Sequence, residues 1–417
     1  MKLLRYILLV AIAASPAWLL GACSLINDDY PVENDPADSR NEATLVLSVA
    51  TVAPSRAGES IEKMHSLRVV LVDADTDTVE YNDFVDNASR PDLFGGQNGA
   101  GVDRLDYATL YRLITTYPGR KTIYFIANEE SVAETSAGSS LSEVLGGVAT
   151  GSKNFAGTVN SIAFTPDFDK PLVYSSTYDF TIPESVLSQP DHTYNYNGTG
   201  TFWVVPAATK FEFSFENMRT EASVTVESLT VSAVADRTYL LADVRGDDRT
   251  KKFGSEDYYW VEWLRRVSDE TQKYPDRPDV SGNKDINARY GWISNYLLPT
   301  GVEHAPLDII GGVSFDIPAA VSATQPTAGP TYTVYAPESR NMEGDVQKYT
   351  FTITVTDNAD GKQYEFTETL GNLAALFRNT HVKVWISIGY KETELELRLR
   401  IGICPWDEET IDIPTFD

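Results

Sequence analysis

The chain has 417 residues, which is long for a single hydrophobic core, so we expect two domains of about 150–200 residues each. Its net charge of −26 argues against nucleic acid as a partner, because phosphate backbones are bound by clustered Lys and Arg. Two cysteines, Cys23 and Cys404, exclude a framework of disulfides, and four histidines leave little material for histidine-based catalysis.

The N-terminus has the pattern of an export signal. Lys2 and Arg5 give a positive start, an apolar run follows from Tyr6 to Leu20, and the run ends in Leu-Gly-Ala before Cys23. This order predicts a signal peptide over residues 1–22, of the bacterial lipoprotein type, with the Cys23 thiol acylated after cleavage. An ordinary signal peptide is the alternative, and the run is short for a transmembrane helix of about 20 residues.

A polar, acidic segment from Cys23 to Glu42 follows and is typical of a flexible tether. The next segment, Ala43 to Val52, is rich in strand-forming residues and apolar on both faces, so we expect a strand buried on both sides. Later segments predict further strands, by a continuous apolar run over Thr122–Ala127 and by a two-residue period over Ser66–Val72, Phe211–Phe215 and Val224–Val234.

The charged stretch Gly246–Lys252 is the predicted divide between two domains. Beyond it, a hairpin is expected at the turn Asp357–Gly361, and two long alternating strands close the chain. The four strands of this block are predicted over Tyr349–Thr356, Lys362–Thr369, Val382–Ile388 and Leu395–Ile403. Helical periodicity is confined to short segments, namely Tyr107–Thr115, Ser140–Leu145, Tyr258–Arg266 and one turn at Asn372–Phe377. The predicted fold is therefore all-β with a few short helices, arranged as two tandem β-sandwich domains.

The sequence offers little catalytic or metal-binding chemistry. Asp73, Asp75 and Asp77 resemble the start of a calcium-binding loop, but Thr78 replaces the required glycine and Phe84 stands where the last glutamate belongs. A solvated turn explains them better. No phosphate-binding loop, nucleophile elbow or zinc-protease motif occurs, so we predict no enzyme, no cofactor and no metal site.

A set of short segments follows the lipoprotein signal and the acidic tether in a fixed order. These are Ala43–Val52 followed by Ser-Arg-Ala-Gly at 55–58, LRVVLVD, KTIYFIANEE, VVPAATKFEFSFENMR, the tetrapeptide Leu376–Asn379, and Cys404-Pro405-Trp406 before a short tail. Together, in this order and over nearly the whole chain, they resemble the fimbrillins of Bacteroidales, the subunits of type V pili.

The resemblance implies that the two predicted sandwiches, at 57–247 and 248–417, are transthyretin-like Greek keys, in a protein that reaches the outer membrane as a lipoprotein. It further implies that an arginine-specific protease cuts between Arg56 and Ala57 and so removes residues 23–56. The removed strand would carry Leu45, Leu47 and Val49 out of an apolar groove, which another subunit would fill with a strand of its own.

The C-terminal tail is the donor strand that the resemblance implies. Trp406 would anchor its base, and Ile411 and Ile413 alternate as groove-filling residues should. A tail that closes its own sandwich is the alternative, and Arg40 is a second position for the cut. A lipoprotein that does not polymerise, either a pilus anchor or a glycan-binding protein that uses exposed Trp and Tyr, is the competing function; a secreted hydrolase is a third.

Overall fold

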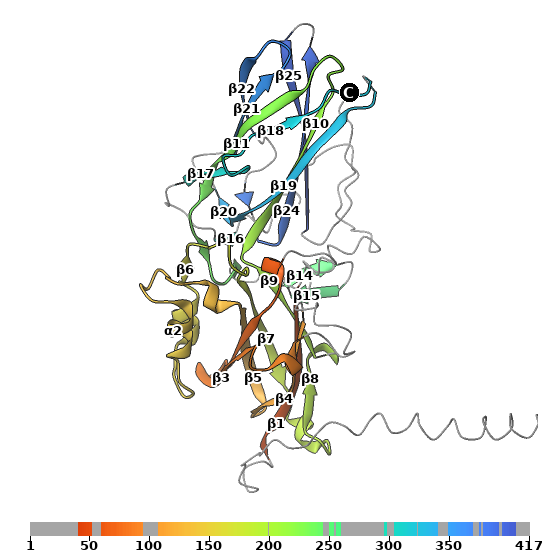
Figure 1. Cartoon of the computed structure of the whole chain (residues 1–417). Helices are drawn as coiled ribbons and strands as arrows, with labels where there is room; N and C mark the ends of the chain where they lie inside the picture. The colour runs from red at the N-terminus through yellow and green to blue at the C-terminus, as the bar shows by residue number, and fades with distance from the viewer. Residues whose placement is uncertain are drawn as a thin grey trace, which may run out of the picture. The chain divides into compact units, whose positions relative to one another are not determined.

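The protein is described here from a computed structural model (Figure 1), which describes residues 41–51, 60–94, 107–198, 200–244, 250–253, 256–259, 296–297, 304–322, 324–340, 349–369, 375–376, 378–391 and 394–405. The chain divides into two units, Met1–Glu42 and Ala43–Asp417, and the strands and helices below all belong to the second. Strands dominate, and the described residues contain two short α-helices, α2 (Leu141–Gly146) and α3 (Phe155–Val159). The predicted all-β class is confirmed.

The first half of the unit is built on an eight-stranded sheet with the order β3-β2-β5-β7-β9-β1-β4, in which β8 also pairs with β1. The strands are β1 (Ala43–Thr51), β2 (Ser66–Asp73), β3 (Thr78–Asp86), β4 (Tyr107–Thr116), β5 (Gly119–Ala127), β7 (Tyr174–Ile182), β8 (Thr193–Asn195) and β9 (Thr201–Pro206). Two residue pairs join β7 to β9. Because inward side chains of β2 and β5 share one core with those of β1 and β9, the sheet folds over onto itself as a sandwich.

The outer face of β2 and β5 forms a second apolar layer in this half. Val70 and Val72 of β2 and Tyr124 and Ile126 of β5 pack there against residues of α2 and α3. The helix α2 starts with a capping box, in which the Ser140 hydroxyl accepts from the Glu143 amide (3.2 Å) and the Ser140 amide donates to the Glu143 carboxylate (3.1 Å). The helix predicted at Ser140–Leu145 is thereby confirmed.

The second half is a sandwich of two sheets. One sheet has the order β19-β10-β24-β25 and the other the order β17-β11-β21-β22, with β18 also paired to β11. The strands are β10 (Ala208–Asn217), β11 (Val224–Ala235), β17 (His304–Asp308), β18 (Phe315–Ile317), β19 (Thr327–Pro337), β21 (Thr350–Asp357), β22 (Lys362–Thr369), β24 (Thr380–Lys391) and β25 (Glu394–Pro405). Alternate residues of both sheets, such as Phe213 of β10 and Ile353 of β21, fill a shared core.

Four two-stranded sheets and five 3-10 helices complete the described elements. The sheets pair β6 (Ala163–Phe164) with β12 (Thr238–Tyr239), β13 (Asp243–Val244) with β16 (Tyr296–Leu297), β14 (Thr250–Phe253) with β15 (Glu256–Tyr259), and β20 (Ser339–Arg340) with β23 (Ala375–Leu376). The 3-10 helices are η2 (Ser60–Glu62), η3 (Pro91–Leu93), η4 (Glu129–Ser131), η5 (Glu184–Ser188) and η6 (Tyr196–Gly198).

All strands predicted from alternation are present, with ends that differ by a few residues at most. The change from one core to the other, however, comes between β9 and β10, where the chain passes through Pro206 and Ala207. This point lies well before the predicted divide at Gly246–Lys252, because the alternating strands β10 and β11 already contribute to the second core.

Three of the helical predictions are wrong where the structure describes the residues. Tyr107–Thr115 lies in strand β4, Tyr258 and Tyr259 end strand β15, and Ala375–Leu376 form strand β23. A bulge lies in the pairing of β4 with β1. Leu45 and Leu47 of β1 face Ile114 and Leu110, so two steps along β1 match four along β4, and these two apolar residues have the spacing of one face of a helix.

Candidate functional site

The first strand, β1, occupies an interior position in the sheet of the first half. It pairs antiparallel with β4 on one side and parallel with β8 and β9 on the other (Figure 1). The Thr44 amide donates to the His192 carbonyl and the Ser48 amide to the Gly200 carbonyl, both at 2.8 Å. Without β1, two rows of backbone groups that face each other would lose their partners.

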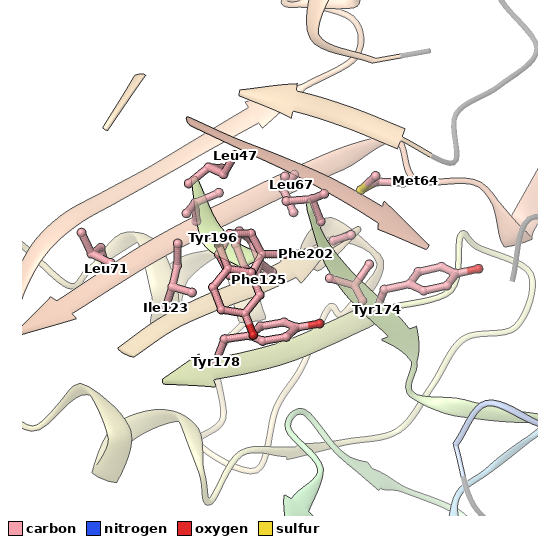
Figure 2. Close-up of a cluster of buried hydrophobic side chains, with 14 of the residues drawn as sticks. Leu47, Met64, Leu67, Leu71, Ile123, Phe125, Tyr174, Tyr178, Tyr196 and Phe202 are labelled. Atoms are coloured by element: carbon pink, nitrogen blue, oxygen red, sulfur yellow. The ribbon is translucent and has the colours of Figure 1, made fainter. Parts of the chain in front are cut away.

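The inward side chains of β1 fill the centre of the first core. Ala43, Leu45, Leu47 and Val49 are at most 1% exposed. Figure 2 shows Leu47 above the rings of Phe125, Tyr196 and Phe202. Burial of a Leu or Val side chain is worth about 1.5–3 kcal/mol, so loss of β1 would leave a deep apolar groove. The structure thus brings together the three predicted residues of the displaced strand, Leu45, Leu47 and Val49.

The opposite face of β1 is buried along its second half. Ser48 and Ala50 are 8% and 6% exposed, although they point away from the core cluster. The prediction of a strand apolar and buried on both sides is confirmed for this part of β1. A strand that replaced β1 would therefore need small or apolar residues on both faces near this end.

Both neighbours of β1 depart from regular pairing at the same place. Val46 faces Asn195 of β8, whereas Ser48 faces Thr201 of β9, so the intervening residues loop out of the sheet. Gly200 closes this loop with φ +68°, and a Cβ atom there would lie 2.6 Å from the Val46 carbonyl oxygen. The backbone of Gly200 can touch β1 because it carries no side chain.

A cluster of aromatic rings forms the floor under β1. The rings of Tyr196 and Phe202 stack with centroids 4.3 Å apart, and Phe202 contacts both Phe125 and Tyr178 at 5.0 Å. The Tyr178 hydroxyl donates to the Trp203 carbonyl and accepts from the Trp203 amide, each at 2.9 Å. These contacts involve no atom of β1, so the floor of the groove has support of its own.

A buried lysine holds the far end of β4. Lys121 Nζ is fully buried and donates to Glu80 Oε1 (2.7 Å) and Asp73 Oδ2 (3.0 Å). The other oxygen of Glu80 accepts from the hydroxyl of Thr116, the residue of β4 that faces Ala43. Burial acts to raise the pKa of Asp73, but the hydrogen bonds from Lys121 and Thr76 outweigh it and lower the pKa to about 2.

Glu62 links the segment after the predicted cut to the second half. Its Oε1 atom accepts from Lys210 Nζ of β10 and from the Tyr335 hydroxyl of β19, both at 2.7 Å. The Tyr174 hydroxyl donates to the Glu62 carbonyl at 2.7 Å, and burial together with the Glu62 charge raises the pKa of Tyr174 well above its usual value. Sequence reasoning missed this cluster, because a charged residue in a short polar segment carries no signal of burial.

Arg378 forms a second connection between the halves. Its guanidinium pairs with Glu338, and both side chains are at most 1% exposed. It also donates to Ser175 Oγ (3.0 Å) of β7 and to the carbonyls of Tyr239 (2.7 Å) and Leu240 (3.2 Å). Arg378 belongs to one of the fimbrillin-like segments, but the sequence did not indicate that it is a buried hub.

The remaining predicted site residues lie outside the described residues. These are Cys23, Arg56, Ala57, Trp406, Ile411 and Ile413. Among the residues that the structure does describe, no group of three or more His, Cys, Asp or Glu is placed to hold a metal ion. The turn at Asp73 is closed by its own carboxylate, which accepts from the Thr76 amide (2.8 Å). Within the same described part of the chain, no helix is long and apolar enough to cross a membrane.

Comparison with known proteins gives matches among solved structures alone, since no family model and no curated protein matches the sequence. The tip fimbrial protein Mfa3 from Porphyromonas gingivalis, solved with a C-terminal truncation, is similar over 88% of this chain and 100% of its own, with 11% identity and a TM-score of 0.46. A fimbrial assembly protein from Parabacteroides distasonis is similar over 87% of this chain and 99% of its own, with 10% identity and a TM-score of 0.40. Both are named as fimbrial proteins.

Proposed function

We propose that this chain is a structural subunit of a type V fimbria that supports adhesion at the cell surface. It is exported as a lipoprotein through Cys23, cut between Arg56 and Ala57, and polymerised by strand exchange. The observation that carries the proposal is the interior position of β1, which is bonded on both edges and buried on its inner face. Its removal would create a template with two unpaired backbone rows and an apolar floor.

The site favours replacement by a strand over closure of the gap. The two edges of the groove are held independently of β1, β4 through Thr116 and Glu80, and β9 through Tyr178 and Trp203. Because these contacts hold both walls, the walls can approach each other only if partly buried hydrogen bonds break. An incoming strand restores the pairing on both sides at once.

The C-terminal tail has the length and pattern for this task. Twelve residues follow Pro405, the last residue of β25, and β1 itself has nine. The alternation of Ile411 and Ile413 matches that of Leu45 and Leu47, with one apolar side chain at every second residue. In the proposed polymer, the tail of one subunit occupies the groove of the next.

Cleavage has a second consequence in this proposal. The lipid on Cys23 lies on the N-terminal side of Arg56, so the cut also releases the subunit from its membrane anchor. A subunit that keeps its lipid would stay at the outer membrane. The presence of Arg56 five residues after the end of β1 therefore favours a polymerising subunit over an anchor.

The test uses the lipid-free chain from Ser24 to Asp417 and an arginine-specific protease. The expected product starts at Ala57 and runs as a ladder of oligomers on an unboiled denaturing gel. The matched variants are Arg56→Ala, which should prevent both the new N-terminus and the ladder, and Arg40→Ala, which should change neither. A truncation that lacks Ile411–Asp417 should be cut normally and remain a monomer.

Two results would contradict the proposal. A chain that resists the protease at Arg56 and stays monomeric would instead be an anchor or a glycan-binding lipoprotein. Normal polymers from the tail truncation would exclude the C-terminal segment as the donor strand.

A further inference from the structure

A polar pocket of about 520 Å³ lies at β6, the strand that pairs with β12 in the first half. We call it the β6 pocket. Its wall comes from three separate segments, namely the turn after η4, the loop after β6, and the link between β11 and β12. Polar and charged residues that line it include Ser131, Glu134, Thr165, Asp167, Lys170 and Arg237. No residue of β1 lines it, so the pocket is separate from the strand-exchange site.

Two cations from different segments meet at this pocket in a chain whose net charge is −26. Lys170 pairs with Asp167 at 3.2 Å and Arg237 pairs with Asp236 at 3.5 Å. The side chains of Lys170 and Arg237 are 46% and 47% exposed, and exposed pairs of this kind contribute little energy. Their charged ends can therefore exchange these partners for a carboxylate ligand at little cost.

The pocket also has a hydroxyl group that lacks a protein partner. Ser131 is 6% exposed and lines the pocket, and its hydroxyl has no hydrogen-bond partner among the described residues. Buried polar groups in proteins are nearly always hydrogen-bonded, so this hydroxyl is available to a polar ligand.

We infer that the β6 pocket binds an acidic sugar. Lys170 and Arg237 bind its carboxylate, and Glu134, Asp167 and Ser131 bind its hydroxyl groups. The pocket has the volume of a small-ligand site, yet its wall is mostly polar where sites for apolar ligands are mostly hydrophobic. This inference deepens the adhesive role proposed above and rests on it for its biological setting.

The test measures direct binding to the chain from Ser24 to Asp417 by titration calorimetry. The probes are methyl β-glucuronide and N-acetylneuraminic acid, with methyl β-glucoside as the neutral counterpart. At least one acidic probe should bind about tenfold or more tightly than the glucoside, because charge-assisted hydrogen bonds are about twice as strong as neutral ones. The double variant Lys170→Ala/Arg237→Ala should lose that preference.

The matched control is Arg120→Ala, which removes an exposed arginine that also pairs with a carboxylate, Asp75 at 3.1 Å, but does not line the pocket. It should bind the sugar like the unchanged chain. Equal binding of acidic and neutral probes, no binding of either acidic probe, or full binding by the double variant would each overturn the inference.

The same variants are also passed through the protease and ladder experiment. An intact ladder without sugar binding would refute the pocket and leave strand exchange standing. Sugar binding by a chain that forms no ladder would refute strand exchange and leave the pocket standing.

Discussion

The two halves of this molecule use their first strand in the same way. In the first half, β1 lies between an antiparallel neighbour, β4, and the parallel strands β8 and β9. In the second half, β10 lies between antiparallel β19 and parallel β24. Both strands direct alternate apolar side chains into the core, for example Leu47 in β1 and Phe213 in β10.

The halves differ in how that strand is connected. β10 follows β9 after one intervening residue, Ala207, so it is held by the sheet before it and the sheet that it enters. β1 has no described element before it and is followed by the segment that contains Arg56. Cleavage of one peptide bond after β1 would therefore free this strand from the rest of the chain, whereas β10 is joined covalently to a strand on either side. The comparison suggests that separability comes from chain connectivity and not from weaker packing.

The largest expected effect is the loss of the buried Phe213 ring from β10, the strand that cleavage does not release. Phe213→Ala should destabilise the chain by about 3–5 kcal/mol, the usual cost of a Phe→Ala change in a packed core. The loss should be equal before and after cleavage at Arg56, because β10 is present in both forms. Denaturant unfolding of the two forms, followed by tryptophan fluorescence, measures it.

The corresponding change in β1 should depend on cleavage. Leu47→Ala should cost about 2–5 kcal/mol in the uncut chain, because Leu47 is 1% exposed among aromatic rings. In the polymer, β1 is gone and the same variant should unfold like the unchanged protein. A Leu47 variant that remained destabilised after cleavage would show that β1 stays in the groove.

Sequence periodicity found the strands but not their partners. β1 was predicted with an accuracy of one residue, yet its parallel pairing with β9 joins segments about 150 residues apart, which local pattern cannot indicate. β4 was predicted as a helix, and its inward residues Leu110 and Ile114, set four apart by a bulge, have a spacing that a helix also has. The buried hubs at Glu62 and Arg378 were missed because a charged residue is expected at the surface unless its partner is known.

Gly200 provides a narrower test of the wall beside β1. Gly200→Ala should destabilise the uncut chain by about 1–3 kcal/mol, because the added Cβ meets the Val46 carbonyl at a positive φ. Gly198 also has a positive φ, +72°, but a Cβ there has open space around it. Gly198→Ala is therefore the matched control for backbone strain alone, and thermal unfolding should show the smaller loss for it. Equal losses would mean that contact with β1 adds nothing.

As the pH is lowered, stability contributed by His381 in the second half should be lost at a higher pH than stability contributed by Asp73 in the first half. Burial, and then the charges of Lys210 and Lys383, lower the pKa of His381 from 6.5 to about 3. The nearest carboxylate, Glu212 at 3.7 Å, does not reverse this. Below pH 6.5 the His381 imidazole binds a proton in the unfolded chain but stays neutral in the folded chain. The free energy of unfolding therefore decreases as the pH falls from 6.5 towards 3.

Asp73 in the first half has a different window. Its pKa is lowered from 3.8 to about 2, so its contribution is present above pH 3.8 and is lost between those values. Between about pH 7 and 5.5, the unfolding free energy should decrease by about 1 kcal/mol less in His381→Gln than in the unchanged chain. Asp73→Asn should leave that interval unchanged and flatten the profile below pH 4. Denaturant unfolding at each pH measures both, and an unchanged profile for His381→Gln would mean that this histidine is protonated in the folded chain.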